Sequence, residues 1–130
     1  MIPDLTGKGV FITGAAGGIG RKLVGAFLST GASVTAADIS DHGLRDLAAA
    51  HADDGLRIRA LDVGNSSDCQ GAIVEAGQVD ILINNAGVMI PPKSFTKDGF
   101  ELQFGTNHLG HFALTGHLLP ILETTDGSRV

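Results

Sequence analysis

A glycine-rich segment near the start of the chain holds the first residues that could do chemistry. Residues 13–20 read Thr-Gly-Ala-Ala-Gly-Gly-Ile-Gly and lie between an apolar run and an amphipathic stretch. Glycine leaves room for an anion beside the backbone, and the start of a helix points free N–H groups and a positive dipole end toward it. The segment therefore predicts a loop that binds the pyrophosphate of a dinucleotide, through Gly14, Ala16, Gly17, Gly18, Ile19 and Gly20.

The spacing of these glycines leaves a second interpretation open. It is Gly-x-x-x-Gly-x-Gly, and the Gly-x-Gly-x-x-Gly dinucleotide pattern occurs nowhere in the chain. In the first interpretation, Gly14 turns the chain sharply out of a strand, and Gly20 lets the helix pack closely on the sheet. In the second, the glycines form only a tight strand-to-helix turn, so residues elsewhere must decide between the two.

Asp38 favours the dinucleotide. It follows the second apolar run, 18 residues after Gly20, close to the offset of about 20 residues at which dinucleotide folds carry a ribose-binding acid. A carboxylate there accepts hydrogen bonds from the ribose hydroxyls and repels a 2′-phosphate, and the adjacent Ile39 and Ser40 bring no cation. We therefore expect Asp38 and Ile39 to bind the cofactor, and NAD to be preferred over NADP. Asp38 could instead cap the helix that follows it.

The elements that must position these residues alternate between strand and helix. Short apolar runs predict parallel strands at residues 9–13, 33–37, 57–61 and 80–84. Apolar residues at helical spacing predict helices at residues 18–29 and 44–49, after residue 66, and between about 97 and 122, with a loop around 53–55. Such alternation implies right-handed crossovers and helices on both faces of the sheet, an α/β doubly wound fold of Rossmann type.

The predicted fold is one dinucleotide-binding domain, residues 1–130, with an incomplete sheet. Residues 128–130 are typical of the start of a fifth strand, so we expect the sheet to be truncated after the fourth strand or at the start of the fifth. In such sheets, ligands bind beyond the carboxyl ends of the strands. The glycine-rich loop and Asp38 both follow predicted strand ends.

Composition excludes several other classes of function. The 130 residues are 43% apolar and carry a net charge of −5, and their scattered basic residues give no electrostatic footprint for nucleic acid or an anionic membrane. No apolar run approaches the roughly 18 residues of a membrane span, and the first residues show no secretory signal. The single Cys69 excludes an internal disulfide, and we expect an inert thiol in a cytoplasmic protein.

Four segments together resemble the short-chain dehydrogenase/reductase family. The loop at 13–20 is similar to that family's cofactor signature, Asp62 and Val63 to its adenine-contacting pair, and residues 84–87 (Asn-Asn-Ala-Gly) to its second signature. Asn107, within Thr-Asn-His-Leu-Gly-His-Phe, stands where the family carries its helical catalytic asparagine. Residues 98–112 most resemble the retinol-dehydrogenase-like branch.

The resemblance implies an NAD(P)-dependent oxidoreductase that acts on an alcohol or carbonyl substrate, and the branch hints at a lipophilic one. The family's chemistry uses Ser, Tyr, Lys and Asn, of which only Asn107 has a counterpart here. The chain holds no tyrosine, so Tyr-x-x-x-Lys is missing, and Ser128 precedes the expected fifth strand whereas the family's serine follows it. We expect the cofactor site without most of the catalytic machinery, and a chain that is inactive alone.

Two further expectations accompany this one. The alternative function is a non-catalytic dinucleotide-binding or assembly module, which the missing tyrosine motivates. The resemblance also suggests a homo-oligomer that associates through the helix near Asn107.

The segments after the third and fourth predicted strands have simple physical roles. Asp62 could accept the adenine amino hydrogens. Asn85, Ala86 and Gly87 are expected to bind the cofactor, because they place backbone and mostly small side chains beside its ribose. The alternative is a polar loop that ties the fourth strand to its neighbours. We expect both roles, with Asn84 more structural than Asn85.

Two other sets of residues invite a functional interpretation. His108, His111 and His117 invite a metal interpretation, and the first two are three residues apart and share a helix face. No carboxylate or cysteine completes a set of ligands, so we expect surface or groove histidines and no metal. Four phenylalanines could line a lipophilic pocket, but we expect them to pack in a helical core: Phe95, Phe100, Phe104 and Phe112.

Overall fold

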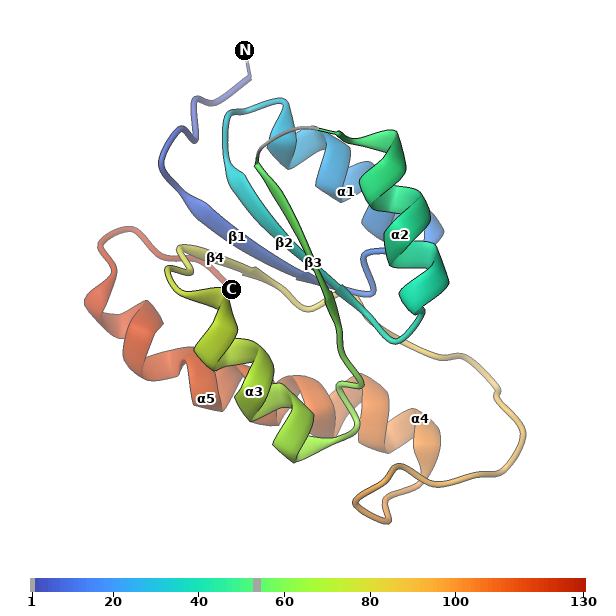
Figure 1. Cartoon of the computed structure of the whole chain (residues 1–130). Helices are drawn as coiled ribbons and strands as arrows, with labels where there is room; N and C mark the ends of the chain where they lie inside the picture. The colour runs from blue at the N-terminus through green and yellow to red at the C-terminus, as the bar shows by residue number, and fades with distance from the viewer. Residues whose placement is uncertain (1, 53–54) are drawn as a thin grey trace.

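A parallel sheet forms the centre of the molecule. In the computed structural model, which describes residues 2–52 and 55–130, the strands lie in the order β3-β2-β1-β4 (Figure 1). They are β1 (Gly9–Thr13), β2 (Ser33–Asp38), β3 (Leu56–Ala60) and β4 (Ile81–Ile83). The chain steps outward from β1 to β3 and then crosses back to place β4 on the other side of β1. The strand order therefore reverses between β1 and β4, where doubly wound folds bind their ligands.

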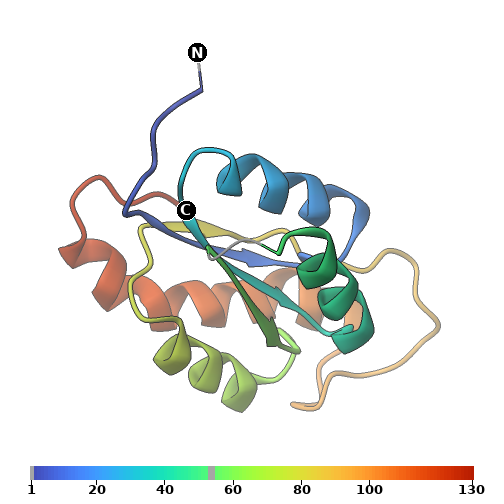
Figure 2. The same cartoon turned by 45° about the horizontal axis from the view of Figure 1, so that its top comes forward.

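Helices cover both faces of this sheet (Figure 2). One face carries α1 (Gly18–Leu28) and α2 (Asp41–Ala50), and the other carries α3 (Ser66–Ala76) and α5 (His111–Thr124). A short α4 (Leu102–Phe104) and a π-helix, η1 (Gly105–Gly110), lead directly into α5. The predicted α/β doubly wound fold is confirmed. No helix within the described ranges is long and apolar enough to cross a lipid bilayer.

The burial of β1 on both faces explains its unbroken apolar run. Val10 and Ile12 belong to the core beneath α1 and α2, which Val24 and Leu44 complete from the helices. Phe11 belongs to the opposite core, formed with α3 and α5. Because successive side chains of a strand point to opposite faces, a strand covered on both sides needs an apolar residue at every position.

Three strands differ slightly from the predicted ranges. The strand β2 ends one residue later than 33–37, at Asp38. The strand β3 begins and ends one residue earlier than 57–61, because its ladder with β2 runs from Leu56 to Ala60. The strand β4 is shorter than 80–84, because only residues 81–83 pair with β1 and the N–H of Asn85 turns back onto the carbonyl of Ile83. Residues 53 and 54 of the predicted loop lie outside the described residues.

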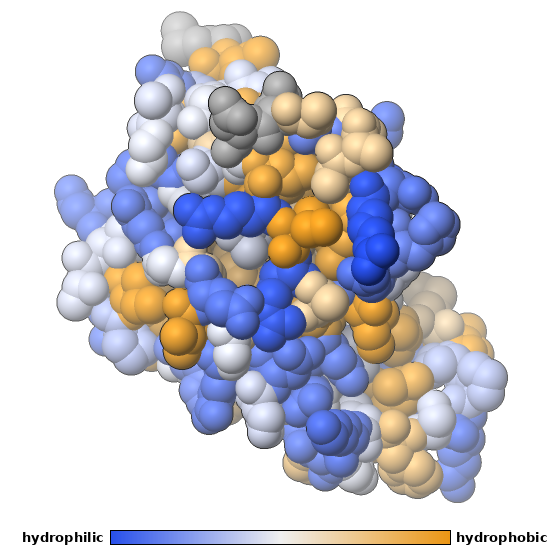
Figure 3. Space-filling model, viewed as in Figure 1, coloured by the Kyte–Doolittle hydropathy of each residue, from blue (hydrophilic) through white to orange (hydrophobic). Residues whose placement is uncertain are grey.

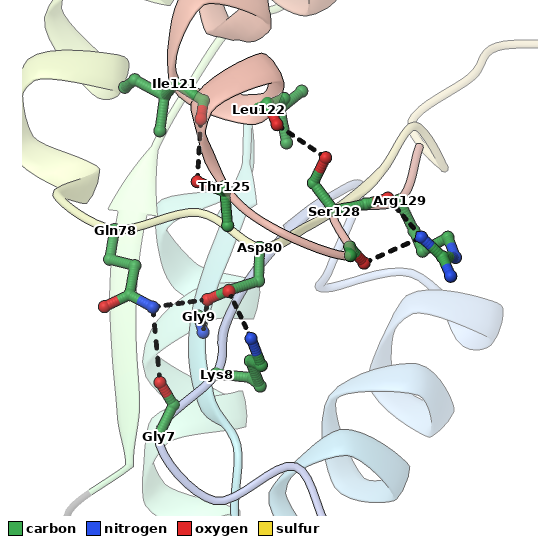
Figure 4. A network of polar contacts seen from close by, with 11 residues as sticks. Gly7, Lys8, Gly9, Gln78, Asp80, Ile121, Leu122, Thr125, Ser128 and Arg129 are labelled. Atoms are coloured by element: carbon green, nitrogen blue, oxygen red, sulfur yellow. Dashed lines mark hydrogen bonds and ion pairs between the residues drawn. The ribbon is translucent and has the colours of Figure 1, made fainter.

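The last residues of the chain lie beside Asp80 and the start of β4 (Figure 4). Arg129 forms a parallel bridge with Ile81. Its N–H donates to the carbonyl of Asp80 (2.9 Å), and its carbonyl accepts the N–H of Leu82 (3.0 Å). This pairing is a single isolated bridge outside the four strands of the sheet, at the residues where the start of a fifth strand is predicted.

The Asp80 carboxylate joins this edge of β4 to the start of β1 (Figure 4). It is almost fully buried and accepts hydrogen bonds from the N–H of Gly9 (2.8 Å), from Nζ of Lys8 (3.0 Å) and from Nε2 of Gln78 (2.8 Å). Burial alone would raise the pKa of Asp80, but these hydrogen bonds and the Lys8 charge outweigh it and lower the pKa. The carboxylate therefore stabilises the junction while it is ionised.

The helix predicted from about residue 97 begins later, at Leu102. Before it, Phe95 and Glu101 form an antiparallel bridge, and Gly99 adopts a φ of +88°, so this stretch is a turn. The Glu101 carboxylate accepts the first N–H groups of the helix. This side-chain cap fixes where the helix starts, and apolar spacing carries no information about it.

Apolar side chains gather on the surface over α4 and the loop before it (Figure 3). The four phenylalanines that were expected in the core are 63%, 49%, 54% and 75% exposed, in the order Phe95, Phe100, Phe104 and Phe112. The core face of α5 belongs to three leucines instead: Leu114, Leu118 and Leu122. The core-packing prediction is wrong, because two of the phenylalanines precede the helix and Phe112 lies on its opposite side from Leu114.

Candidate functional site

The predicted pyrophosphate loop leaves the carboxyl end of β1 and enters α1. Gly14 has a φ of +63°, a conformation that favours glycine. A Cβ atom on Gly14 would lie 2.7 Å from Cα of Ala86 in the chain that follows β4. The expected sharp turn is confirmed, and glycine is required there for close contact with Ala86 as well.

The N-terminus of α1 faces open space. Within residues 17–21, all of which the structure describes, no side chain caps the helix and no acid occupies its first turn. By contrast, Ser40 caps α2 and Asn65 caps α3. The first N–H groups of a helix have no partner inside it, so α1 presents donors and a positive dipole end to an incoming anion. A Cβ atom on Gly18 would meet nothing within 4 Å.

Gly20 packs against the loop rather than the sheet. A Cβ atom on this residue would lie 2.1 Å from the carbonyl oxygen of Gly14. The predicted close approach is therefore present, but its partner differs. Arg21, the first cation of α1, donates to the carbonyl oxygens of Ala16 (2.8 Å) and Gly43 (3.0 Å). Its guanidinium group thus holds the loop to α2.

The Asp38 carboxylate lies at the end of β2 and contacts the loop. Its Oδ2 accepts the N–H of Ala16 and its Oδ1 accepts the N–H of Ser40, both at 2.9 Å. The Ser40 hydroxyl caps α2 by accepting the N–H of Gly43, so the alternative in which Asp38 caps this helix is wrong. A carboxylate offers about four lone-pair sites, which leaves acceptor capacity for ribose hydroxyls.

Two adjoining hollows form one groove along these strand ends, which we call the cofactor groove. The first, of about 380 Å³, is lined by the loop, the end of β2 and residues 85–87. The second, of about 270 Å³, shares four residues with the first and continues past Ile39 to Asp62 and Val63. Every residue predicted to bind the cofactor lines one of the two hollows except Ala16, whose N–H holds Asp38.

The cofactor groove includes residues that sequence reasoning missed. The turn before α4 and the helix itself contribute Phe95, Lys97 and Leu102. Lys97 brings a positive charge to a lining that also holds Asp38 and Asp62. These residues follow no strand end and carry no motif, so only the tertiary fold brings them to the groove.

Thr13 joins the ends of β1 and β4. It is fully buried, and its Oγ1 accepts the N–H groups of Asn85 and Ala86, both at 3.0 Å. The Asn85 side chain in turn donates to the carbonyl oxygens of Thr13 (3.0 Å) and Gly14 (3.1 Å). Asn84 donates only to a hydroxyl on α5. The expectation that Asn84 is the more structural asparagine is wrong, because Asn85 is the one that reaches the end of β1.

Asn107 lies in the π-helix and holds the chain that follows β4. Its Oδ1 accepts the N–H of Val88 and its Nδ2 donates to the carbonyl of Val88, both at 2.8 Å. A Cβ atom on Gly87 would lie 3.4 Å from Oδ1 of Asn107. At the end of η1, a Cβ on Gly110 would lie 2.3 Å from the carbonyl oxygen of Val63. π-Helical turns are rare in proteins, and those that occur are often found at functional sites. This one places Asn107, the predicted catalytic residue, beside the groove.

A third hollow, of about 430 Å³, lies on the outward side of η1 and α5. Asn84, Asn107, Phe112 and both His108 and His111 line it, so the two histidines share a face as their spacing predicts. The His108 ring stacks on Phe104, with 5.3 Å between the ring centres. In residues 2–52 and 55–130, no three His, Cys, Asp or Glu side chains are grouped to hold a metal ion.

Cys69 is a buried residue in the first turn of α3. Its Sγ donates to the carbonyl of Val63 at 3.6 Å. Burial, and then the negative charges of Asp68, Asp62 and Asp98, raise its pKa to about 11. Since the thiolate is the reactive form, the burial and the raised pKa support the prediction of an inert thiol.

Comparisons with known proteins agree with this geometry. Residues 8–130 match the family described as short chain dehydrogenase. The chain is 38% identical to retinol dehydrogenase 14 of Mus musculus, over 95% of this chain and 42% of that protein. It spans less than half the length of the curated relatives it matches.

Two solved structures share the fold. An uncharacterised protein from Mycobacterium paratuberculosis is 38% identical, with a TM-score of 0.85 over 92% of this chain and 44% of that one. A 3-ketoacyl-(acyl-carrier-protein) reductase from Brucella melitensis, solved in complex with NADH, is 30% identical, with a TM-score of 0.79 over 90% of this chain and 50% of that one.

Proposed function

The chain belongs to the short-chain dehydrogenase family, and we propose that its cofactor groove binds NAD(H) for the interconversion of an alcohol and a carbonyl compound. The observation that carries this proposal is the meeting of the uncapped N-terminus of α1 and the Asp38 carboxylate in one groove. A dinucleotide needs both, because its pyrophosphate takes N–H donors and its ribose takes an acceptor. The nicotinamide ring supplies the hydride chemistry when bound.

The residues present fit such a group. Gly18 leaves the approach to the α1 N–H groups open. The Asn85 side chain is bound to the Thr13 carbonyl, so the small residues Ala86 and Gly87 form the opposite wall of the groove. Asn107 holds that wall from behind through Val88. These residues would bind and orient the cofactor, and Asn107 is the candidate for a catalytic role.

Preference for NAD over NADP follows from Asp38. A 2′-phosphate would bring negative charge against this carboxylate, and the nearby Arg21 already donates two hydrogen bonds to the carbonyl oxygens of Ala16 and Gly43. Lys97 is the single cation in the described lining of the groove, and Asp38 and Asp62 outnumber it. The bound NADH in the Brucella melitensis reductase supports the same cofactor.

Fluorescence titration with NADH and NADPH tests this site. We expect saturable enhancement, with NADH bound more tightly. Asp38→Ala should weaken NADH binding by about 10- to 150-fold, the loss expected for charged hydrogen bonds worth about 1.5–3 kcal/mol. The matched control is Asp41→Ala, because Asp41 is an exposed acid paired with Arg45 outside the groove. Absence of saturation with both cofactors would refute the site, and an unchanged NADH preference in Asp38→Ala would refute the ribose assignment.

The substrate is proposed to be a lipophilic alcohol or its carbonyl counterpart. The names of the retinol dehydrogenases support an alcohol, and the apolar side chains of the third hollow, Phe112 and Leu119, support a lipophilic one. The 130 residues contain no tyrosine, so we propose that they supply the cofactor site and Asn107 but do not turn over substrate alone. Any NAD reduction by this chain with a lipophilic alcohol would contradict that part of the proposal.

A non-catalytic nucleotide-binding or assembly module is the second candidate, and the same lack of tyrosine favours it. Mass spectrometry of the protein isolated from its native source distinguishes the two. A mass near 13.3 kDa would favour the module, and a much larger mass would favour the oxidoreductase.

A further inference from the structure

His111 lies between the segment that carries Asn107 and the end of β1. It is the first residue of α5, directly after the π-helix. Its Nε2 lies 3.0 Å from Oγ1 of Thr13, and its Nδ1 lies 3.4 Å from the carbonyl oxygen of Asn107. Thr13 in turn binds the backbone of residues 85–86, which line the cofactor groove. His111 therefore contacts the groove wall through one intermediate side chain.

The hydrogen-bond capacity of Thr13 determines the protonation of His111. A hydroxyl group has one hydrogen and two lone pairs. The N–H groups of Asn85 and Ala86 can only donate, and both approach Oγ1 at 3.0 Å. The hydroxyl hydrogen is left for Nε2 of His111 at 3.0 Å or for the carbonyl of Ile83 at 3.4 Å. The shorter contact makes Nε2 the acceptor, so the ring hydrogen resides on Nδ1 and faces Asn107.

The surroundings favour the neutral ring. Burial lowers the pKa of His111, and its hydrogen bond to the Asn107 carbonyl offsets only part of this effect. Thr13 contacts the ring from β1, and Asn84 lines the same hollow from the end of β4; neither side chain carries a charge. Among the described residues that line this hollow, the other titratable group is His108 of the π-helix, and no carboxylate lines it.

We propose that neutral His111 is a positioning residue for the cofactor groove. By accepting the Thr13 hydroxyl hydrogen, it keeps the lone pairs of Thr13 directed at Asn85 and Ala86 and so holds the groove wall in place. Protonation puts a hydrogen on Nε2 against an oxygen whose lone pairs are already taken. The contact is then lost, the wall loosens, and cofactor affinity falls as the solution becomes acidic. Only the link to the cofactor rests on the proposed function.

Nitrogen NMR on the 15N-labelled full chain tests the hydrogen bond. We expect His111 to be the Nδ1–H tautomer at neutral pH and to have a pKa below the ordinary value for histidine, because its ring is partly buried. The amide signals of Asn85 and Ala86 should shift with the His111 titration. They should lose this pH dependence in His111→Gln, which keeps an acceptor but does not titrate. An Nε2–H tautomer, or amide signals that ignore the titration, would overturn the proposal.

Titrations with NADH across the same pH range extend the test to the groove. The NADH dissociation constant should rise about fivefold as His111 becomes protonated, as expected for one hydrogen bond. His117→Gln should keep this step and His111→Gln should lack it, while His111→Leu should bind weakly at every pH. A step that persists in His111→Gln would overturn the proposal. If the wild type binds no NADH, the proposed function fails, and the NMR result alone decides whether His111 holds Thr13.

Discussion

Replacing Gly20 with alanine should destabilise the fold, whereas replacing Gly18, two residues earlier in the same helix, should not. The added Cβ on Gly20 would lie 2.1 Å from the carbonyl oxygen of Gly14, inside the loop that joins β1 to α1. The added Cβ on Gly18 would meet nothing within 4 Å. The two variants make the same chemical change at the start of α1 but place the new methyl group in different surroundings.

The change in unfolding free energy depends on the balance between helix propensity and overpacking. Alanine gains up to about 1 kcal/mol over glycine from helix propensity. At Gly20 this gain is opposed by overpacking, which costs about 1–3 kcal/mol and reaches the upper part of that range when the contact is with backbone. We expect Gly20→Ala to lose about 1–2 kcal/mol of unfolding free energy, or about 3–8 °C in Tm for a domain of this size. Gly18→Ala should keep or slightly raise the Tm.

The effect on cofactor binding should be the reverse, because Gly18→Ala is the variant that should weaken NADH binding directly. A methyl group on Gly18 stands where the pyrophosphate approaches the α1 N–H groups, so NADH should bind about tenfold more weakly, equivalent to one charge-assisted hydrogen bond. Thermal unfolding followed by circular dichroism and NADH fluorescence on the same samples measure both effects. An unchanged Tm in Gly20→Ala, or full NADH affinity in Gly18→Ala, would refute the reasoning about this loop.

Three further predictions concern other parts of the fold. Asp80→Asn should cost about 1–3 kcal/mol of unfolding free energy. The pKa of Asp80 is lower in the folded chain than its unfolded value of 3.8, so the stability that this carboxylate contributes is fully present above pH 3.8 and is lost as the pH falls through the folded pKa. The unfolding free energies of wild type and variant, measured with urea, should therefore converge at that low pH. Asn85→Ala should lower stability by about 1–2 kcal/mol through the loss of two hydrogen bonds, and Asn84→Ala by less than about 1 kcal/mol, as calorimetry can check. Cys69, with a pKa of about 11, should react with a thiol reagent at mildly alkaline pH only after unfolding, and rapid reaction of the folded chain would contradict its burial.

The sheet and the strand-end residues could be predicted from the sequence because both depend on local patterns. A strand buried on both faces must be apolar throughout, so β1 and β4 stand out as runs. Parallel strands end at one edge, so Asp38, Asp62 and Asn85 had to lie near one another once four strands were recognised. The order of the strands does not follow from the alternation of strand and helix, because doubly wound folds with the same alternation occur with different strand orders.

The other features depend on contacts between distant segments. The π-helix at Gly105–Gly110 arises where glycine lets the helix approach Val63 and Thr96, and no periodicity marks it. The helix start at Leu102 is fixed by the Glu101 cap, so the apolar spacing of the phenylalanines misled the core prediction. The roles of Asn84 and Asn85 depend on which side chain faces β1. Because both residues are asparagine, the sequence does not distinguish them.

A crystal structure of the full chain grown with NAD would show whether the cofactor groove binds the dinucleotide. We expect the pyrophosphate over the backbone N–H groups at the start of α1, the adenosine ribose hydroxyls on the Asp38 carboxylate, and the adenine beside Asp62 and Val63. A dinucleotide bound elsewhere, or one that enters the groove without contact to Asp38, would contradict this assignment.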